Sequence, residues 1–288
     1  MRQFITLAAA AFMSLGAVGA HAATTGNIIF LVDESGSMGG DQAWLAGMVG
    51  DLDAAMTTAG VTATYGVVGF GATSPEVAPH THQALADATT TAASLGSMDT
   101  SGGLEDGWAA MAYALTAFTF DAGAAINFVL VTDEDRDNVG GIYSTLTYAS
   151  LLADLQAMNV TLNAVVDANY QCNGAGADLI GMDDSGTGYA ADGGGGYTTC
   201  TTAAAYDGYV TTIADYVNLA IATGGAAWDL NILRSGGLLA TSFTNAFIDI
   251  KVEEIVTTPG GVPIPGAVWL MAGGLGGLAA LRRRKKAA

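Results

Sequence analysis

The chain alternates short apolar runs with longer segments whose apolar residues recur at three- and four-residue steps. Residues 27–32 are aliphatic or aromatic apart from Asn27, which is typical of a short buried strand. Residues 41–60 carry Leu, Met and Val at helical spacing, and Gly60 is suited to end the helix that this spacing predicts. Strands that alternate with helices of this length predict an α/β fold with a doubly wound, mostly parallel sheet flanked by helices.

The same two periods predict the other elements. The segment 71–82 contains Pro75 and Pro79, so we expect a loop there. His80 and His82 in this loop are expected to face solvent, because no third soft ligand lies nearby in the sequence. Residues 243–255 fit both periods, and we predict a helix. Further strands are expected at 61–70, 126–132, 160–166 and 227–233, and further helices at 83–95, 104–118, 145–158 and 206–222.

Two of the apolar runs end in an acid. The first is followed by Asp33, Ser35 and Ser37, and the run 126–132 is followed by Asp133. Ligands of an open α/β sheet collect at the carboxyl ends of the strands, where both acids would lie. Carboxylate and hydroxyl oxygens on a turn suit Mg²⁺ or Mn²⁺ better than zinc or copper. The alternative for Asp-x-Ser-x-Ser is a polar turn that caps the next helix.

The acidic excess of the chain limits its partners. The net charge is −18 over all 288 residues. Between the two terminal segments only Arg136, Arg234 and Lys251 are basic, against 27 acidic residues, so this region carries −24. Such a charge argues against nucleic acid and anionic membrane surfaces as partners, and favours cations.

Both ends have the pattern of targeting segments. Residues 1–22 begin with a charge at Arg2, continue with an apolar run and end in Ala-His-Ala, which predicts a secretory signal removed by signal peptidase. At the other end, 257–288 contains a Pro motif, an apolar stretch at 267–281 and five basic residues. The roughly 15 apolar residues are fewer than the about 20 that span a bilayer comfortably. This segment is therefore either a permanent transmembrane tail anchor or a sorting signal cut near the Pro motif.

The Pro motif is Val262-Pro263-Ile264-Pro265. With the apolar stretch and the basic end, it resembles the PEP-CTERM group of sorting tails in the variant Val-Pro-Leu-Pro-Ala, with Ile264 in place of Leu and Gly266 in place of Ala. The resemblance implies processing by an exosortase, a membrane peptidase of Gram-negative bacteria. It implies a final location in the cell envelope, at the surface or in the extracellular matrix.

The chain has two cysteines, Cys172 and Cys200, which bracket a segment rich in Gly, Asp and Tyr. In an exported protein an even pair favours a disulfide over a metal site. We place an insertion in the fold at about 167–205. Its aspartates lack the spacing of an EF-hand, so we expect a plain acidic loop there.

Most of the chain, 23–256, resembles the von Willebrand factor type A (VWA) domain. The metal-ion-dependent adhesion site (MIDAS) of that family uses Asp-x-Ser-x-Ser after the first strand and an Asp after a later strand, which Asp33, Ser35, Ser37 and Asp133 match. The resemblance implies that the two serines ligate Mg²⁺, or Mn²⁺ or Ca²⁺, directly, and that the two aspartates often act through water. An open coordination position would accept an acidic group of a partner.

The middle loop of this resemblance departs from its commonest form, which supplies a Thr. Placing Gly107-Trp108 at the start of the next helix makes Glu105 the loop ligand, as in integrin β-type domains. Thr100 is the alternative, although it lies further from that helix start than the usual Thr.

These observations predict a non-catalytic, exported cell-adhesion or matrix module whose partner is a protein or glycan that offers a carboxylate. A hydrolase is disfavoured, because His-Glu-x-x-His and Gly-x-Ser-x-Gly are absent and His80 and His82 are the only histidines in 23–256. The alternative function is a structural matrix or surface component whose metal only stabilises the fold.

Overall fold

The structure is a computed structural model that describes residues 24–72, 78–138, 143–174 and 179–258. Its strands are β1 (Thr25–Asp33), β2 (Thr62–Phe70), β3 (His80–Ala86), β4 (Ala125–Val131), β5 (Val160–Val166), β6 (Ala168–Cys172), β7 (Gly181–Asp183), β8 (Gly188–Ala191), β9 (Tyr197–Cys200), β10 (Ala203–Gly208) and β11 (Ala226–Asp229). Its helices are α1 (Gly39–Thr58), α2 (Ala88–Leu95), α3 (Gly107–Ala117), α4 (Tyr148–Ala157), the π-helical turn η2 (Ile213–Val217), α5 (Asn218–Ala222), α6 (Leu230–Arg234) and α7 (Gly237–Thr257).

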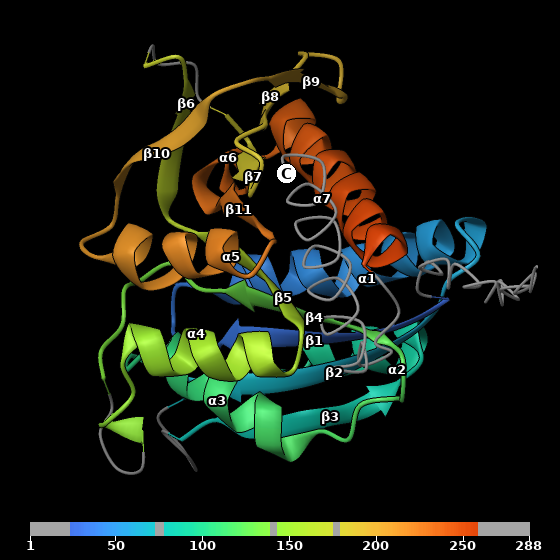
Figure 1. Cartoon of the computed structure of the whole chain (residues 1–288), viewed down its shortest axis with the longest axis vertical. Coiled ribbons are helices and arrows are strands. Elements are labelled where there is room, and N and C mark those ends of the chain that lie inside the picture. The colour runs from blue at the N-terminus through green and yellow to red at the C-terminus, as the bar shows by residue number, and fades with distance from the viewer. Residues whose placement is uncertain (1–23, 73–77, 139–142, 175–178, 259–288) are drawn as a thin grey trace, which may run out of the picture.

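A sheet with helices on both sides forms the centre of the molecule (Figure 1). In the described residues it has nine strands in the order β3-β2-β1-β4-β5-β11-β7-β8-β9. The five strands from β2 to β11 are parallel to their neighbours, while β3 at one edge and β7, β8 and β9 at the other are antiparallel. This topology confirms the predicted doubly wound, mostly parallel α/β class.

The central strand β1 contributes to both halves of the core. Ile28 and Phe30 pack in the cluster under α1 and α7, whereas Ile29 and Leu31 pack in the cluster under α3 and α5. Successive side chains of a strand point to opposite faces, and both faces of this sheet are covered. That is why a central parallel strand is a continuous apolar run in the sequence.

The predicted helix at 41–60 is confirmed as α1. Its apolar side chains at three- and four-residue steps are buried. Gly60 follows the helix with φ of +80°, a left-handed conformation that glycine adopts without steric cost. The predictions for β2, β4, β5 and α4 are confirmed as well.

The edge strand β3 corrects two predictions. We expected a loop through His82 and a helix from Gln83, but His80–Ala86 pairs with β2 and α2 begins only at Ala88. The open edge of β2 offers unpaired backbone groups, and pairing with it outweighs the weak local preference of a segment rich in Ala and Thr. His80 and His82 are consequently half-buried rather than solvent-facing.

In its described residues, the segment after β5 forms five short strands rather than a plain acidic loop. β7, β8 and β9 extend the central sheet beyond β11, and β6 pairs with β10 in a separate ribbon. Cys172 at the end of β6 and Cys200 at the end of β9 form a disulfide. The predicted helix 206–222 begins late, because Tyr206 lies in β10 and helical structure starts only at η2.

In the C-terminal part of the described chain, one predicted strand is shorter than expected and one predicted helix is confirmed. The strand expected at 227–233 stops at Asp229, whose carboxylate accepts a hydrogen bond from the Asn231 N–H at 2.8 Å and caps α6. The helix predicted at 243–255 is confirmed as α7, and its Phe243 and Phe247 rings pack edge-on against Trp228.

Three predicted features of the termini fall on residues that the structure does not describe. The signal at 1–22, the Val262–Pro265 motif and the apolar stretch at 267–281 all lie outside the described residues. Within the described ranges, no helix has both the length and the hydropathy needed to cross a membrane.

Candidate metal centre

The predicted metal ligands meet at the carboxyl ends of two neighbouring strands. β1 and β4 are hydrogen-bonded in parallel, with Val32 opposite Val131, so the residues that follow them lie side by side. Asp33, Glu105 and Asp133 each offer a carboxylate oxygen, and these three atoms lie within 4.8 Å of one another. The sheet therefore gathers acids that lie up to 100 positions apart in the chain.

The two serines complete this cluster of oxygens. Ser35 Oγ lies 3.0 Å from Ser37 Oγ, and Ser37 Oγ donates to Asp133 Oδ1 at 3.1 Å. The turn that carries them is held by Asp33, whose Oδ1 accepts from the Ser35 N–H at 2.7 Å. The helix that follows begins at Gly39, and its N-cap residue Met38 makes no side-chain capping bond, so this polar turn does not serve as a cap for α1.

In the middle loop, Glu105 is the candidate whose carboxylate lies among these oxygens. Glu105 is buried directly before Asp106, and Asp106 caps α3 by accepting from the Ala109 N–H at 3.0 Å. Thr100 is exposed, and its backbone N–H donates to Asp99 Oδ1. The geometry therefore favours Glu105 as the loop ligand.

Thr132 belongs to the cluster as well, a role that the sequence pattern does not predict. Its buried hydroxyl lies 2.8 Å from Asp33 Oδ2 and 3.3 Å from Glu105 Oε2. The hydroxyl carries one proton, so it donates to one of these acids at a time. The signal was available, since Thr132 is the last residue of a buried run and directly precedes Asp133.

Crowding of the acids shifts their titration. Burial, followed by the hydrogen bond and charge of Asp33, raises the pKa of Glu105 to about 9. Burial also raises the pKa of Asp33 above its ordinary range. Negative charges that are brought together in a dehydrated place are unfavourable without a cation, and a bound dication reverses that penalty. This donor set of carboxylates and hydroxyls fits a hard ion such as Mg²⁺.

A basic side chain also reaches the cluster from a distant part of the chain. Arg234, at the end of α6, places Nη1 3.0 Å from Asp133 Oδ2 and Nη2 2.6 Å from Asp41 Oδ2. Arg234 is one of three basic residues between the terminal segments, and nothing near it in the sequence indicates its partners. Its guanidinium partly compensates the acidic charge around Asp133.

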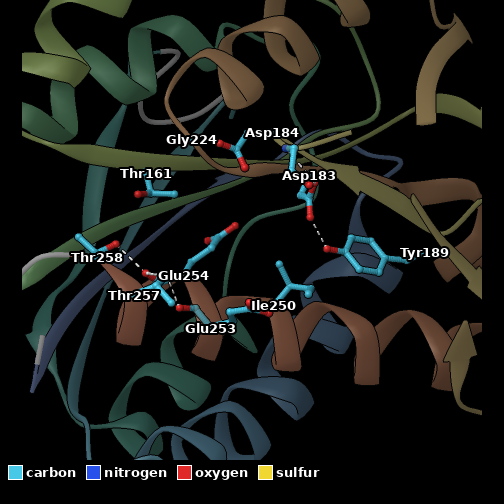
Figure 2. A pocket seen from close by; sticks show the side chains of 11 residues that line it. Thr161, Asp183, Asp184, Tyr189, Gly224, Ile250, Glu253, Glu254, Thr257 and Thr258 are labelled. Atoms are coloured by element: carbon cyan, nitrogen blue, oxygen red, sulfur yellow. Dashed lines mark hydrogen bonds between the residues drawn. The ribbon is translucent and has the colours of Figure 1, made fainter. Parts of the chain in front are cut away.

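A cavity of about 380 Å³ lies where β5 and β11 begin, at the amino ends of the parallel strands and away from these ligands. Figure 2 shows Glu253, Glu254 and Thr257 of α7, with Thr258 directly after the helix, on one side of the cavity and Asp183 and Asp184 on the other. Asp183 already accepts from two backbone N–H groups and from the Tyr189 hydroxyl. Glu254 Oε2 already accepts from Asn127, Asn163 and Lys251. The cavity contributes nothing to the candidate metal centre.

Comparison with known proteins gives partial similarities in structure. No protein-family model matches the sequence, and no curated protein matches it. The chain is similar to proximal thread matrix protein 1 from the mussel byssus, with 21% identity and a TM-score of 0.40 over 51% of this chain and 38% of that one. It is also similar to the VWA domain of SpRpn10, with 11% identity and a TM-score of 0.36 over 49% of this chain and 74% of that one. A third similar structure is a von Willebrand factor type A protein from Catenulispora acidiphila, with 16% identity and a TM-score of 0.35 over 50% of this chain and 33% of that one.

Proposed function

We propose that this chain is an exported, non-catalytic binding module of the VWA type that holds its partner through a divalent cation. One observation carries the proposal: side chains from three separate loops place hydroxyl and carboxylate oxygens together at the carboxyl edge of the sheet. A local polar turn does not need the acids of the other two loops. A metal centre does, because the ion takes several oxygen ligands.

Each residue has a distinct part in this proposal. Ser35 and Ser37 are neutral ligands, and Asp33, Glu105 and Asp133 supply negative charge around the ion. Thr132 orients Asp33 through its hydroxyl. When bound, Mg²⁺ supplies a Lewis-acidic position that attracts a carboxylate. Neutral hydroxyl ligands leave more of the positive charge of the ion available to the partner than carboxylates in their place would.

The partner is a protein or glycan that offers a carboxylate, in the cell envelope or extracellular matrix. The strongly acidic region between the termini supports this choice, because it repels polyanions over long range, while an isolated carboxylate is attracted only at the cation. The signal-like segment 1–22 and the sorting-type tail 257–288 support export and surface delivery.

Capture of the partner from envelope and matrix material tests the proposal. We expect binding with Mg²⁺, loss of binding in EDTA, and recovery when Mg²⁺ is restored. Ser35→Ala should behave like EDTA treatment, and a small soluble carboxylate should compete. The matched control is Ser97→Ala, since Ser97 Oγ donates to the Ser94 carbonyl outside the cluster.

Two results would contradict the proposal. Binding that survives both EDTA and Ser35→Ala would exclude the adhesion role. Chelation that lowers the melting temperature but leaves binding unchanged would favour the alternative, a structural matrix component whose metal only stabilises the fold.

A further inference from the structure

A second cluster of potential ligands lies beside the oxygen cluster and has different chemistry. Glu34 follows Asp33 directly, and its carboxylate faces His80 and His82 on β3. One ligand atom from each of these three residues lies within 4.8 Å of the others. None of the three belongs to the cluster of Asp33, Ser35, Ser37, Glu105 and Asp133.

The backbone of β3 directs the imidazoles of His80 and His82 to the same face of the strand, where Glu34 lies. His80 and His82 are two positions apart on a strand, so their side chains share a face. His82 Nε2 lies 2.8 Å from Glu34 Oε1, and His80 Nε2 lies 3.5 Å from Glu34 Oε2. The ring centroids of the two histidines are 4.5 Å apart. Ligand atoms around a tetrahedral zinc ion lie about 3.4 Å apart, given metal–ligand distances of about 2.1 Å, so small adjustments would suffice.

Glu34 is an incompletely satisfied buried acid. Its side chain is 0% exposed, and among the described residues Glu34 Oε2 has no hydrogen-bond partner. Its other oxygen accepts from the Asp99 N–H at 3.3 Å and contacts His82. A buried carboxylate oxygen without a donor is costly, and a cation between it and the imidazoles would satisfy it. The histidine side chains are 25% and 23% exposed, which leaves a path for an ion to enter.

The hydrogen bond on the far side of His80 prepares it for ligation. His80 Nδ1 lies 3.3 Å from the carbonyl oxygen of Ala78, which can only accept. The proton of a neutral His80 ring in this bond is therefore on Nδ1, and the lone pair of Nε2 points toward Glu34. A backbone carbonyl in this position is one of the usual outer partners of a metal-ligating histidine.

Gly69 makes room for the cluster. A Cβ at this position would lie 2.2 Å from Glu34 Oε2 and 2.6 Å from His82 Nε2, so no other residue fits without moving these groups. Gly69 pairs with His80 in the β2–β3 ladder. The absence of a side chain at Gly69 therefore keeps open the space between the acid and the imidazoles.

We propose that Glu34, His80 and His82 form a binding site for a borderline divalent transition metal of the Zn²⁺ class. Two imidazole nitrogens and one carboxylate select this class over Mg²⁺, which prefers oxygen ligands and retains waters. Three protein ligands leave the fourth position of a tetrahedral ion open to water or another ligand. The chain would thus carry two metal sites of different selectivity, on adjacent residues Asp33 and Glu34.

Metal titration of the purified, untagged chain tests the site. Zn²⁺ binding is measured by calorimetry in excess Mg²⁺, and Co²⁺ is added as a spectroscopic probe of tetrahedral coordination. We expect one Zn²⁺ that Mg²⁺ does not displace. His80→Gln and His82→Gln should each weaken binding about a hundredfold or more, because losing even an outer partner of a ligand costs about 10–100-fold. Gly69→Ala should have a similar effect.

Two controls separate this site from its surroundings. Ser35→Ala, which damages the oxygen cluster, should leave Zn²⁺ affinity and the Co²⁺ spectrum unchanged. Thr81→Val changes the residue between the two histidines, whose hydroxyl contacts the Tyr113 hydroxyl instead. The Thr81→Val variant should bind Zn²⁺ as tightly as the unaltered chain does. With these controls, the experiments can contradict the Zn²⁺ site without contradicting the proposed adhesion function, and they can contradict the adhesion function without contradicting the Zn²⁺ site.

A measurement on the unaltered chain covers the case in which a variant does not fold. Zn²⁺ should protect His80 and His82 from acylation by diethylpyrocarbonate, as measured by mass spectrometry of the peptide that contains both. Three results would overturn the proposal: no Zn²⁺ bound at millimolar concentration, Zn²⁺ affinity unchanged by replacing both histidines, or Zn²⁺ that fails to protect them. Any of these would leave Glu34, His80 and His82 as a hydrogen-bonded network without an ion.

Discussion

Arg234 Nη1 lies 3.0 Å from Asp133 Oδ2, at the rim of the oxygen cluster. The same guanidinium donates from Nε and Nη2 to Asp41 on α1. One side chain at the end of α6 thus connects the loop after β4 with the start of α1, and adds a positive charge beside the place proposed for a dication.

Replacing this charge should strengthen cation binding and weaken the fold. In Arg234→Gln, Mg²⁺ affinity should rise by up to about tenfold, because a unit charge about 6 Å from a dication in water costs about 1.4 kcal/mol. The free energy of unfolding should fall by about 1–3 kcal/mol, since the nearly buried Asp41 loses its charged donor. Calorimetric Mg²⁺ titration and urea denaturation in EDTA measure the two effects.

The control for this variant is Arg136→Gln. Arg136 pairs with Asp106 and lies over the Trp108 ring, so its loss should lower stability with a smaller gain in Mg²⁺ affinity. Unchanged Mg²⁺ binding in Arg234→Gln would show that the guanidinium charge does not oppose the ion, and weaker binding would show that the guanidinium helps to build the site.

The raised pKa of Glu105 predicts a pH dependence of the metal-free protein. The folded state holds this proton up to a pKa of about 9, whereas the unfolded chain releases it near the ordinary value of 4.5. The folded state therefore binds more protons between these values, and the free energy of unfolding should fall as pH rises from about 5 to about 9. The raised pKa of Asp33 acts in the same direction.

Urea denaturation in EDTA at several pH values measures this dependence. Glu105→Gln should flatten the decline, while the exposed Glu253→Gln should not. Mg²⁺ should reverse the trend, because the ligand must lose its proton to bind metal and affinity then rises with pH. Identical pH profiles for Glu105→Gln and the unaltered chain would refute the role given to Glu105.

The Thr132 hydroxyl should be required for both stability and metal affinity. In Thr132→Val the shape is nearly kept, but Asp33 Oδ2 loses the donor at 2.8 Å. A lost partner for a buried acid costs about 1–3 kcal/mol, which urea denaturation would detect. Mg²⁺ affinity should fall because Asp33 is no longer held in place. Thr132→Ser restores the hydroxyl and should recover both properties; if it does not, the methyl group is the important part.

The disulfide should stabilise the segment between β6 and β9. Cys172 and Cys200 are 28 positions apart, and closing a loop of this length contributes roughly 3–4 kcal/mol in the chain-entropy description. Replacing both by Ser should lower the free energy of unfolding by about that amount. A reductant should have the same effect on the unaltered chain and none on the double variant. Equal stability with and without the bond would mean that the strands hold this segment unaided.

Local pattern was sufficient for the centre of the fold. The apolar run of β1 and the helical spacing of α1 are visible in the sequence because each is dictated by burial of its own side chains. Asp33, Ser35, Ser37 and Asp133 could be assigned to one edge of the sheet for the same reason, since ligands of parallel sheets collect at the carboxyl ends. The proposal of a hard-cation site needed no more than this.

Sequence periodicity did not predict the strands that form only because they pair with distant segments. His80–Ala86 has no strong local preference, and only the open edge of β2 makes it a strand. This error hid the second cluster, because a loop would have left His80 and His82 in solvent. The strands of 168–208 were missed for a similar reason: each is short and gains its partners from the sheet.

The amino-acid order alone was enough to establish the alternation of strands and helices, the acids and serines that end two strands, and the acidic charge of the chain. These features depend on neighbouring residues and on composition. Only the packing of distant segments established which strands are adjacent, that the Glu105 carboxylate lies among the oxygens, that Arg234 reaches Asp133, and that Glu34 meets two histidines. Those side-chain contacts join residues tens to about a hundred positions apart, and their geometry depends on how the packed layers place the backbone, which local periodicity does not encode.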